Sequence, residues 1–259
     1  MDCVKCADTG YLVAPEGEMA VARVCDCQIP CPVCDDTRFS IDYSVTPPVT
    51  RPCGCIQLRK RIEKFNEAQI PARFHRSTLD NYEELAGNQA KIKMHFNRYR
   101  QAYEPGAKGL LLSGIPGVGK THLICGLLRH LGLELNKTVR FVDFFNLLDM
   151  LKSSWNDDKG DGDIMNSLAS VDVLAIDEMG KRPMTAWELS VLDQLISRRY
   201  NSRKTMFITT NLAIDTAGQS QNVKRRRLVD EVQERIYSRL IEMCDFLEVK
   251  GVDYRISKQ

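Results

Sequence analysis

Eight of the ten cysteines in this chain form a tandem repeat within its first 55 residues. Each copy has two cysteines separated by two residues, then 18 residues, then two cysteines separated by one residue, and the copies are offset by 28 positions. The two sets are Cys3, Cys6, Cys25 and Cys27, and Cys31, Cys34, Cys53 and Cys55. Four thiolates in two close pairs are what a tetrahedral zinc ion requires. The sequence therefore predicts two zinc ions per chain.

The pairing of these cysteines follows less directly from the spacing. Sequential pairing closes each copy on its own ion, and the duplication favours it. An interleaved arrangement, in which Cys3 and Cys6 share an ion with Cys53 and Cys55, stays open. Disulfide bonds would require an export signal, and residues 1–10 lack the basic-then-apolar pattern of one. We therefore expect reduced, zinc-ligating cysteines in a cytoplasmic protein.

A small β-hairpin is predicted within each cysteine copy. Residues 11–14 and 20–24 flank a Pro-Glu-Gly turn, and the run 39–45 is followed by two prolines. A hairpin of this size has too little core to be stable alone. Metal binding should therefore supply much of its folding free energy.

A charged helix predicted over residues 56–69 leads out of the cysteine repeat, and Pro71 ends it. Ile56, Ile62 and Phe65 lie on one side of this helix. The predicted domains are a zinc-binding domain at 1–55, a helical linker at 56–72 and a larger domain at 73–259.

The net charge of the chain does not indicate a nucleic-acid partner by itself. The formal value is +2, and eight thiolates around two Zn²⁺ would lower it to −2, because eight negative charges outweigh four positive ones. No apolar run reaches the roughly 18–20 residues that a membrane span needs, so we expect no membrane partner.

Helices and strands alternate after residue 72, which predicts an α/β fold with a parallel sheet. A glycine-rich motif follows the apolar strand 109–113 and precedes an apolar helix. This context predicts a P-loop, in which backbone N–H groups hold phosphates, Lys120 bridges phosphate oxygens and Thr121 takes a Mg²⁺ position. The predicted nucleotide-binding residues are Gly114, Pro116, Gly117, Val118, Gly119, Lys120, Thr121 and His122.

Two further predicted strands end in polar residues. The apolar run 173–176 leads to Asp177 and Glu178, and the strand 205–210 leads to Asn211. Behind a P-loop, Asp177 fits an outer-sphere Mg²⁺ ligand and Glu178 fits the base that polarises an attacking water. Asn211 can sense the terminal phosphate or hold that water.

Arg235 and Arg239 lie four residues apart on a predicted helix and therefore share one face. An arginine at such a place can supply charge to a phosphoryl group bound by a neighbouring subunit. The alternative interpretation is a structural salt bridge to a nearby acid.

Together these motifs resemble the DnaC/DnaI/IstB branch of the AAA+ ATPases over about residues 70–259. The segments 70–74, 79–82 and 253–255 belong to the same ordered set. The resemblance implies a AAA+ P-loop core that binds ATP and Mg²⁺. The implied roles are Walker A at Lys120 and Thr121, Walker B at Asp177 and Glu178, sensor 1 at Asn211, and a trans-acting arginine finger near Arg239, with Arg235 as the neighbouring candidate.

The resemblance also implies a bacterial or phage-encoded helicase loader. Its zinc domain would bind the replicative hexameric helicase, its AAA+ domains would self-associate, and single-stranded DNA would stimulate hydrolysis. The short stretch after Arg239 leaves no room for a C-terminal lid, so we expect weak or partner-dependent hydrolysis. The alternatives are an IstB-like transposase helper, which would bind duplex DNA, and an ATP-switch adaptor with little hydrolysis.

The segment 143–155 occupies the place of the family's single-strand-binding helix. Phe145 can stack on bases and Lys152 can contact phosphate, with Ser153 and Ser154 beside it. The basic run 224–227 is a second candidate for DNA contact, and a solvated loop is its alternative.

Overall fold

The structure is a computed structural model of the chain, and it describes residues 3–154, 161–214 and 226–257. The chain divides into two compact units. Unit 1 comprises Met1–Arg76 with Arg129–Thr138, and unit 2 comprises Ser77–Leu128 with Val139–Gln259. The helix predicted as a linker belongs to unit 1 in this division, and the boundaries at residues 55 and 72 stay a prediction.

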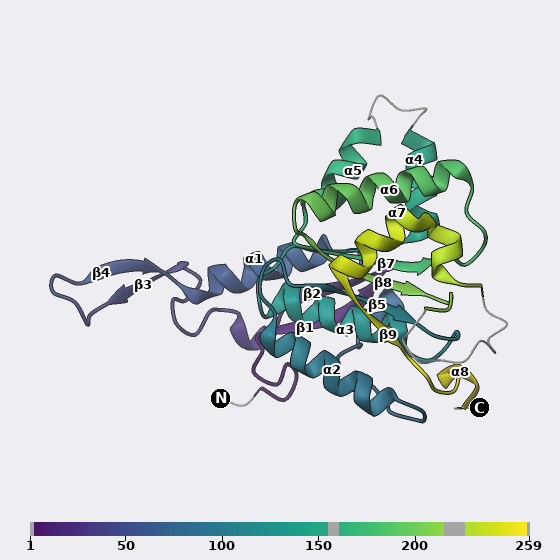
Figure 1. Cartoon of the computed structure of the whole chain (residues 1–259). Helices are drawn as coiled ribbons and strands as arrows, with labels where there is room; N and C mark the ends of the chain where they lie inside the picture. Colours follow the sequence, from purple (N-terminus) through teal and green to yellow (C-terminus); the bar gives the residue numbers. More distant parts are fainter. Residues whose placement is uncertain (1–2, 155–160, 215–225, 258–259) are drawn as a thin grey trace. The chain divides into compact units, whose positions relative to one another are not determined.

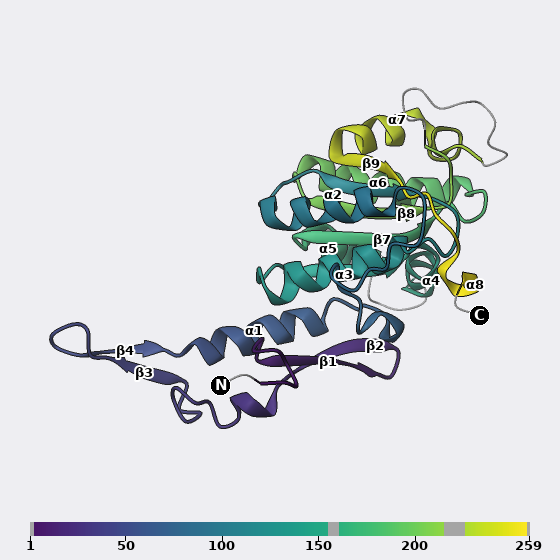
Figure 2. The same ribbon diagram turned by 90° about the horizontal axis from the view of Figure 1, so that it is seen from below.

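Unit 1 contains two antiparallel hairpins, one in each cysteine copy. The first pairs β1 (Tyr11–Glu16) with β2 (Met19–Val24), and the second pairs β3 (Phe39–Asp42) with β4 (Val49–Pro52). A short 3-10 helix, η1 (Asp26–Gln28), follows the first hairpin. Figure 2 shows β3 and β4 extending away from β1 and β2. Each copy contains the predicted hairpin, but β1 continues through Pro15 and Glu16, which the sequence assigned to the turn, and β3 ends at Asp42 instead of residue 45.

The helix α1 (Gly54–Asn66) packs against β2 of the first hairpin. Its buried side chains are Leu58, Ile62 and Phe65, which share a helix face because they are spaced four and three residues apart. Ile56, which the sequence placed on this side, is only half-buried, since the buried stripe begins at Leu58. A second short helix, η2 (Ala72–Phe74), follows Pro71.

Unit 2 is built on a five-stranded parallel sheet with the order β6-β7-β8-β5-β9. Figure 1 shows α4 to α7 on one face of this sheet and α2 and α3 on the other. The strands are β5 (Gly109–Ser113), β6 (Val139–Asp143), β7 (Val173–Met179), β8 (Thr205–Thr210) and β9 (Cys244–Glu248). The helices are α2 (Gln89–Ala102), α3 (Lys120–Leu133), α4 (Phe144–Ser154), α5 (Asp161–Ser170), α6 (Ala186–Asn201), α7 (Leu228–Met243) and α8 (Tyr254–Ser257). The predicted α/β fold is confirmed.

The central strands explain where the polar site residues gather. β5, β7 and β8 are covered on both faces, which is why each contains several consecutive apolar residues instead of an alternating pattern. The strands are parallel, so their carboxyl ends lie along one edge of the sheet. The residues that follow β5, β7 and β8 are therefore brought together at that edge.

Candidate functional site

A glycine-rich turn joins β5 to α3 at the carboxyl edge of the sheet. Gly117 and Gly119 have φ values of +78° and +91°, which residues with a side chain rarely adopt. The space beside them is also filled. A Cβ atom on Gly117 would lie 1.8 Å from the Asp253 carboxylate, and one on Gly119 would lie 2.6 Å from the Tyr82 ring. Glycine is therefore required at both positions for the turn to close.

The Lys120 side chain is buried inside this turn. Its ammonium group donates hydrogen bonds to the carbonyl oxygens of Gly114 at 2.8 Å and Ile115 at 3.0 Å. It also donates to Asn211 Oδ1 at 2.9 Å, a contact that the adjacency of β5 and β8 makes possible. The predicted Walker A lysine and sensor asparagine therefore meet, and anionic phosphate oxygens can replace the carbonyl acceptors.

Asp177 is buried at the end of β7 and accepts hydrogen bonds from two threonine hydroxyls. Thr121 Oγ1 donates to Asp177 Oδ1 at 2.9 Å, and Thr209 Oγ1 donates to the same oxygen at 2.5 Å. Burial raises the pKa of Asp177, while the two donors act in the opposite direction. A hydroxyl and a carboxylate in direct contact offer the oxygen ligands that Mg²⁺ prefers. The donor set at Thr121 and Asp177 therefore fits this ion.

Glu178 follows with a φ of +56°, in the left-handed region. Its backbone N–H donates to Thr209 Oγ1 at 3.0 Å, and the pairing of β7 with β8 shifts register between Ile176 and Met179. The Glu178 carboxylate accepts a hydrogen bond from Lys181 Nζ at 2.7 Å. The predicted base is thus paired with a lysine three residues further along.

The remaining predicted nucleotide-binding residues have different surroundings. Pro116 is exposed, whereas Val118 is buried and its carbonyl oxygen accepts a hydrogen bond from the Tyr82 hydroxyl at 3.0 Å. His122 Nε2 lies 3.0 Å from the Thr78 carbonyl oxygen, and burial lowers the pKa of this histidine. The His122 side chain therefore contacts the segment that precedes α2.

Both candidate arginine fingers face α6 of the same chain. Arg239 donates to Asp193 Oδ1 at 2.9 Å and to Ser197 Oγ at 2.6 Å, and its guanidinium lies over the Tyr200 ring. Arg235 lies 3.8 Å from the Asp193 carboxylate, and 69% of its side chain is exposed. Arg239 is therefore held by side chains of α6, while Arg235 is largely in solvent.

The predicted DNA-binding residues at the end of α4 do not all lie on its exposed side. Lys152 is exposed, with its ammonium 5.2 Å from the centre of the Trp187 ring. Ser153 is also exposed. Ser154 is buried and donates to the Leu151 carbonyl oxygen at 2.8 Å, because it falls on the buried face of the helix. Ser154 is therefore not accessible to DNA in this conformation.

Phe145, at the start of α4, is half-buried against the core, and the Arg182 guanidinium lies 4.9 Å from its ring centre. Base stacking on this ring would require Arg182 to move. In the basic run 224–227, Arg226 donates to the Gly180 carbonyl oxygen at 2.7 Å. Trp155, Lys224 and Arg225 lie outside the residues that the structure describes.

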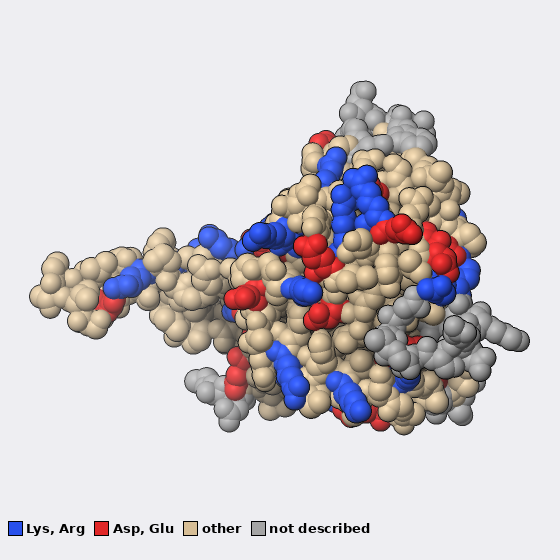
Figure 3. All heavy atoms as spheres, in the orientation of Figure 1, with Lys and Arg blue, Asp and Glu red and all other residues tan. Residues whose placement is uncertain are grey.

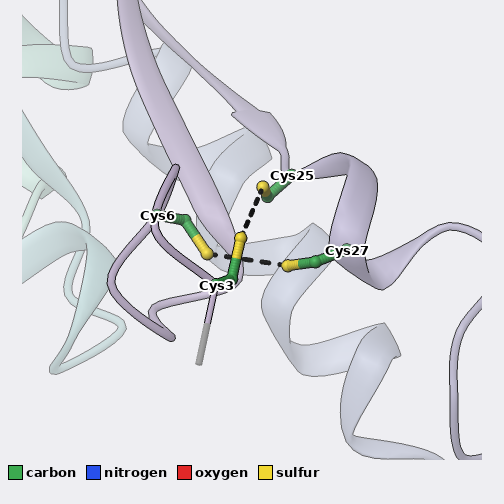
Figure 4. Close-up of side chains that lie close together, drawn as sticks. All are labelled: Cys3, Cys6, Cys25 and Cys27. Carbon is green, nitrogen blue, oxygen red and sulfur yellow. Dashed lines mark hydrogen bonds between the residues drawn. The ribbon is translucent and has the colours of Figure 1, made fainter. Parts of the chain in front are cut away.

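The eight repeated cysteines form two separate tetrads, and the pairing is sequential. In the first tetrad (Figure 4), the Cys3 and Cys25 sulfurs are 3.9 Å apart and the Cys6 and Cys27 sulfurs are 3.6 Å apart. The second tetrad repeats both distances. A tetrahedral site with Zn–S bonds of about 2.3 Å has S–S edges of about 3.8 Å. Both tetrads therefore fit a zinc ion.

Residues repeated with the cysteines brace the first turn of each copy. The Asp8 carboxylate accepts from the Cys3 N–H at 2.8 Å, and the Asp36 carboxylate accepts from the Cys31 N–H at 3.2 Å. Backbone N–H groups, chiefly that of Cys6, lower the pKa of the Cys3 thiol to about 7. The equivalent Cys31 thiol has its pKa lowered to about 7 as well. Cys3 and Cys31 thus favour the thiolate, the form that binds metal, whereas burial and neighbouring thiols raise the pKa of Cys27 and Cys55 to about 12.

The sequence interpretation missed three residues that shape the turn and the Asp177 network. Thr209 was only part of the strand before Asn211, and its position one residue from that strand tip is the signal that could have found it. Tyr82 and Asp253 were noted as members of an ordered set without a place in the site. The Tyr254 N–H also donates to the Gly117 carbonyl oxygen at 3.0 Å, so the end of the described chain lies against the turn.

Comparison with known proteins places this geometry in a family. The model of the IstB-like ATP binding protein family matches residues 54–259. The chain belongs to this family. ATP binding is implied by that membership, and the predicted resemblance to the DnaC/DnaI/IstB branch is confirmed. Within the described residues, no helix is both long and apolar enough to span a membrane.

Several relatives of this IstB-like chain carry the name of a helicase loader. The replicative helicase loader DnaC of Buchnera aphidicola subsp. Schizaphis graminum is 26% identical over 158 residues, covering 60% of this chain and 63% of the relative. The chain therefore matches less than two thirds of the length of that relative. A crystal structure of the DnaC helicase loader has a TM-score of 0.59 and 27% identity, covering 69% of this chain and 99% of that one. The DnaI crystal structure, at 22% identity and a TM-score of 0.53 over 71% of this chain and 93% of that one, shows the shared fold.

Proposed function

We propose that this chain is an ATP-dependent loader that places a replicative helicase on single-stranded DNA. The main support is the group of contacts that joins Lys120 to Asn211 and Thr121 to Asp177 at one edge of the sheet. The name of the DnaC relatives supports the helicase as partner. ATP would be hydrolysed at an interface between two copies of the chain.

The site residues divide the chemistry among them. The backbone N–H groups of the glycine-rich turn and Lys120 would hold the phosphates, and Thr121 with Asp177 would hold Mg²⁺, which neutralises charge on the phosphate oxygens. Glu178 would accept a proton from the attacking water once it leaves Lys181. Asn211, which now accepts from Lys120, would orient that water.

The α7 arginines would complete the site of a neighbouring copy. Arg239 is the first candidate, and it must exchange Asp193 and Ser197 for a phosphate oxygen. Arg235 is the second candidate, since it is already exposed. Dependence on a neighbour would make hydrolysis weak in an isolated copy and stronger when partners or DNA assemble the copies.

Mixing two inactive variants tests whether the site is shared. Lys120→Ala should abolish ATP binding, and Arg239→Ala should leave binding intact but slow hydrolysis by about 10³-fold or more. In a mixture, the Arg239→Ala copies retain a glycine-rich turn that binds ATP. The Lys120→Ala copies retain Arg239, which can act on the ATP of a neighbouring copy. Turnover should therefore return. A mixture no more active than its parts would refute hydrolysis between copies through Arg239, and the Arg235→Ala variant would then be tested in its place.

The loader assignment is tested with the host's hexameric helicase and single-stranded DNA. The full chain should bind the helicase, transfer it to a closed single-stranded circle in the presence of ATP, and hydrolyse ATP faster when DNA is present. Lys120→Ala serves as the nucleotide control. Transfer that is equally efficient without the chain would refute the proposed function.

An IstB-like transposase helper is the second candidate, because the family that matches this chain is described as IstB-like ATP binding proteins. Such a protein would bind duplex DNA and a transposase. Comparison of ATP-dependent binding to duplex and single-stranded oligonucleotides of equal length separates the two functions. Preference for duplex DNA would favour the helper.

A further inference from the structure

The two hairpins of unit 1 are copies whose equivalent faces have different surroundings. With the 28-residue offset, Tyr11 and Ala22 of the first hairpin correspond to Phe39 and Thr50 of the second. The strand registers match this correspondence, since Val13 pairs with Ala22 as Ile41 pairs with Thr50. Side chains alternate between the faces of a strand, so each hairpin has one face defined by these positions.

In the first hairpin this face is covered. Its buried residues, Tyr11, Ala20 and Ala22, all lie on it. The Arg129 guanidinium lies over the Tyr11 ring, and the Tyr11 hydroxyl donates to the Glu134 carboxylate.

The helix α1 covers the strand β2 of the first hairpin. Asn66 at its end accepts from the Ala22 N–H at 2.7 Å and donates to the Ala22 carbonyl oxygen at 3.0 Å. This side chain therefore satisfies both backbone groups of Ala22 at the edge of the hairpin. The first hairpin is thus covered by a helix that ends in a side-chain carboxamide.

The equivalent face of the second hairpin is bare and apolar. We call Phe39, Ile41, Tyr43 and Pro52 the exposed hairpin face; Phe39 and Ile41 are each 53% exposed and Tyr43 is 75% exposed. Tyr11, which corresponds to Phe39 in the first hairpin, is only 6% exposed. Figure 3 shows the hairpin mostly as uncharged residues, with basic and acidic side chains beside each other on the side in view. Among the described residues of unit 1, no side chain bonds the backbone of Thr50 as Asn66 bonds that of Ala22.

The opposite face of the second hairpin is the more polar one, although Val49 on it is 46% exposed. There Asp42 and Arg51 form an ion pair at 2.9 Å, and Ser44 donates to Asp42. A polar face and an apolar face on a two-stranded hairpin are typical of a surface that is covered on one side only. A second element should therefore bury the exposed hairpin face.

We propose that the exposed hairpin face binds an amphipathic helix of the partner protein, in the way that α1 binds the first hairpin. This inference rests on the proposed function, in which that partner is the replicative helicase. The buried stripe of α1 and its carboxamide predict the pattern of the bound helix. Apolar residues should stand at positions i, i+4 and i+7, followed by Asn or Gln at i+8, as Leu58, Ile62, Phe65 and Asn66 do.

Charge favours a basic helix as the occupant. Outside its buried stripe, α1 carries the half-buried Arg59 and Lys64 and the exposed Lys60 and Glu63. Arg59 lies 3.4 Å from the Asp36 carboxylate of the second copy. Four thiolates around one Zn²⁺ carry a net charge of −2, and Asp35 and Asp36 stand beside the second tetrad. A helix that docks beside this tetrad therefore meets negative charge, which basic side chains complement.

Two lysine substitutions on opposite faces of the same hairpin test the proposal in the full chain. Ile41→Lys removes an apolar contact and repels a basic helix, and should weaken binding to the hexameric helicase by about tenfold or more. Val49→Lys is the matched control, because Val49 is 46% exposed and pairs with Asp42 on the opposite face. Its binding should stay within about twofold of the unmodified chain. Both variants should hold two zinc ions per chain, which shows that the tetrads still form.

Tyr43→Lys is a second test of the same face that should not disturb folding, because Tyr43 follows β3 and is mostly in solvent. It should also weaken binding. A photo-crosslinking residue at position 43 should capture a helical segment of the helicase with the predicted pattern. Equal binding by all variants, or equal weakening by Val49→Lys, would overturn the assignment of this face while the loader function stands. If the unmodified chain does not bind the helicase, the proposed function fails and the occupant assigned here fails with it.

Discussion

We predict that removal of the Arg199 side chain lowers the free energy of unfolding by a large amount. This residue of α6 is fully buried, and its two terminal nitrogens donate to five backbone carbonyl oxygens at 2.6–3.3 Å. The acceptors are Leu168, Ala169, Val171, Asp172 and Thr205. Burial lowers the pKa of the guanidinium to about 10, which leaves it protonated at neutral pH. One guanidinium group thus donates hydrogen bonds to carbonyl oxygens at the end of α5, in the turn after it and at the start of β8.

The size of the loss follows from the groups left behind. Arg199→Ala leaves buried carbonyl oxygens without a donor, each costing about 1–3 kcal/mol when counted alone. These costs do not add fully, and removing the buried charge recovers part of them, so we expect a net loss of about 3–5 kcal/mol. Arg199→Lys keeps the charge but offers three N–H donors, so it should lose about half as much.

Urea unfolding followed by tryptophan fluorescence measures this loss in unit 2, because both tryptophans, at positions 155 and 187, belong to that unit. The matched control is Arg198→Ala. Arg198 directly precedes Arg199 in the sequence, and its side chain donates to Asn166 Oδ1 at 2.7 Å on the exposed surface. It should change stability by no more than about 0.5 kcal/mol. A loss below about 1 kcal/mol for Arg199→Ala would refute the reasoning, since one carbonyl alone should cost that much.

Three further outcomes are expected. Cys27→Ser should lower the zinc content from two ions to one per chain, as measured by release to a colorimetric chelator, whereas loss of both ions would contradict separate tetrads. Asp177→Asn should raise the melting temperature of the nucleotide-free protein while abolishing Mg²⁺-dependent hydrolysis. Burial raises the pKa of Asp177, so the folded chain loses stability as pH rises through the range in which this group ionises, and the amide removes that cost; an unchanged melting temperature with an unchanged pH profile would contradict this. Lys152→Glu should weaken ATP-dependent binding to single-stranded DNA without lowering the melting temperature, while Lys91→Glu, exposed on α2, should not; equal binding by the two variants would place the DNA elsewhere.

The sheet and its polar edge could be predicted because local sequence determines them. β5, observed at Gly109–Ser113, and β8, observed at Thr205–Thr210, have the bounds expected from their apolar runs. A parallel sheet then places the residues after each strand at one edge, which is why Lys120 and Asn211 were expected in one site before their contact was known.

Contacts between distant segments could not be predicted in the same way. Arg199 follows Arg198 in the same helix, and only the tertiary fold distinguishes the buried arginine from its half-buried neighbour. Ser154 was expected beside Lys152 on the surface, but its helical position turns it to the core. Asp253 contacts the glycine-rich turn from a segment more than a hundred positions away in sequence, and no periodicity encodes such a meeting.

The contacts of the site residues within one chain give a physical reason for partner-dependent hydrolysis under the proposed function. Lys120 bonds two carbonyl oxygens, Glu178 is paired with Lys181 at 2.7 Å, and Arg239 is paired with Asp193 at 2.9 Å. Each group needed for chemistry therefore has an internal partner that must first be given up. The exposed pair at Glu178 contributes no more than about 1 kcal/mol, so it opens readily, whereas Arg239 is bound by a carboxylate and a hydroxyl together. Release of the arginine is thus the more costly step, and it is the step that assembly with a neighbouring copy would offset.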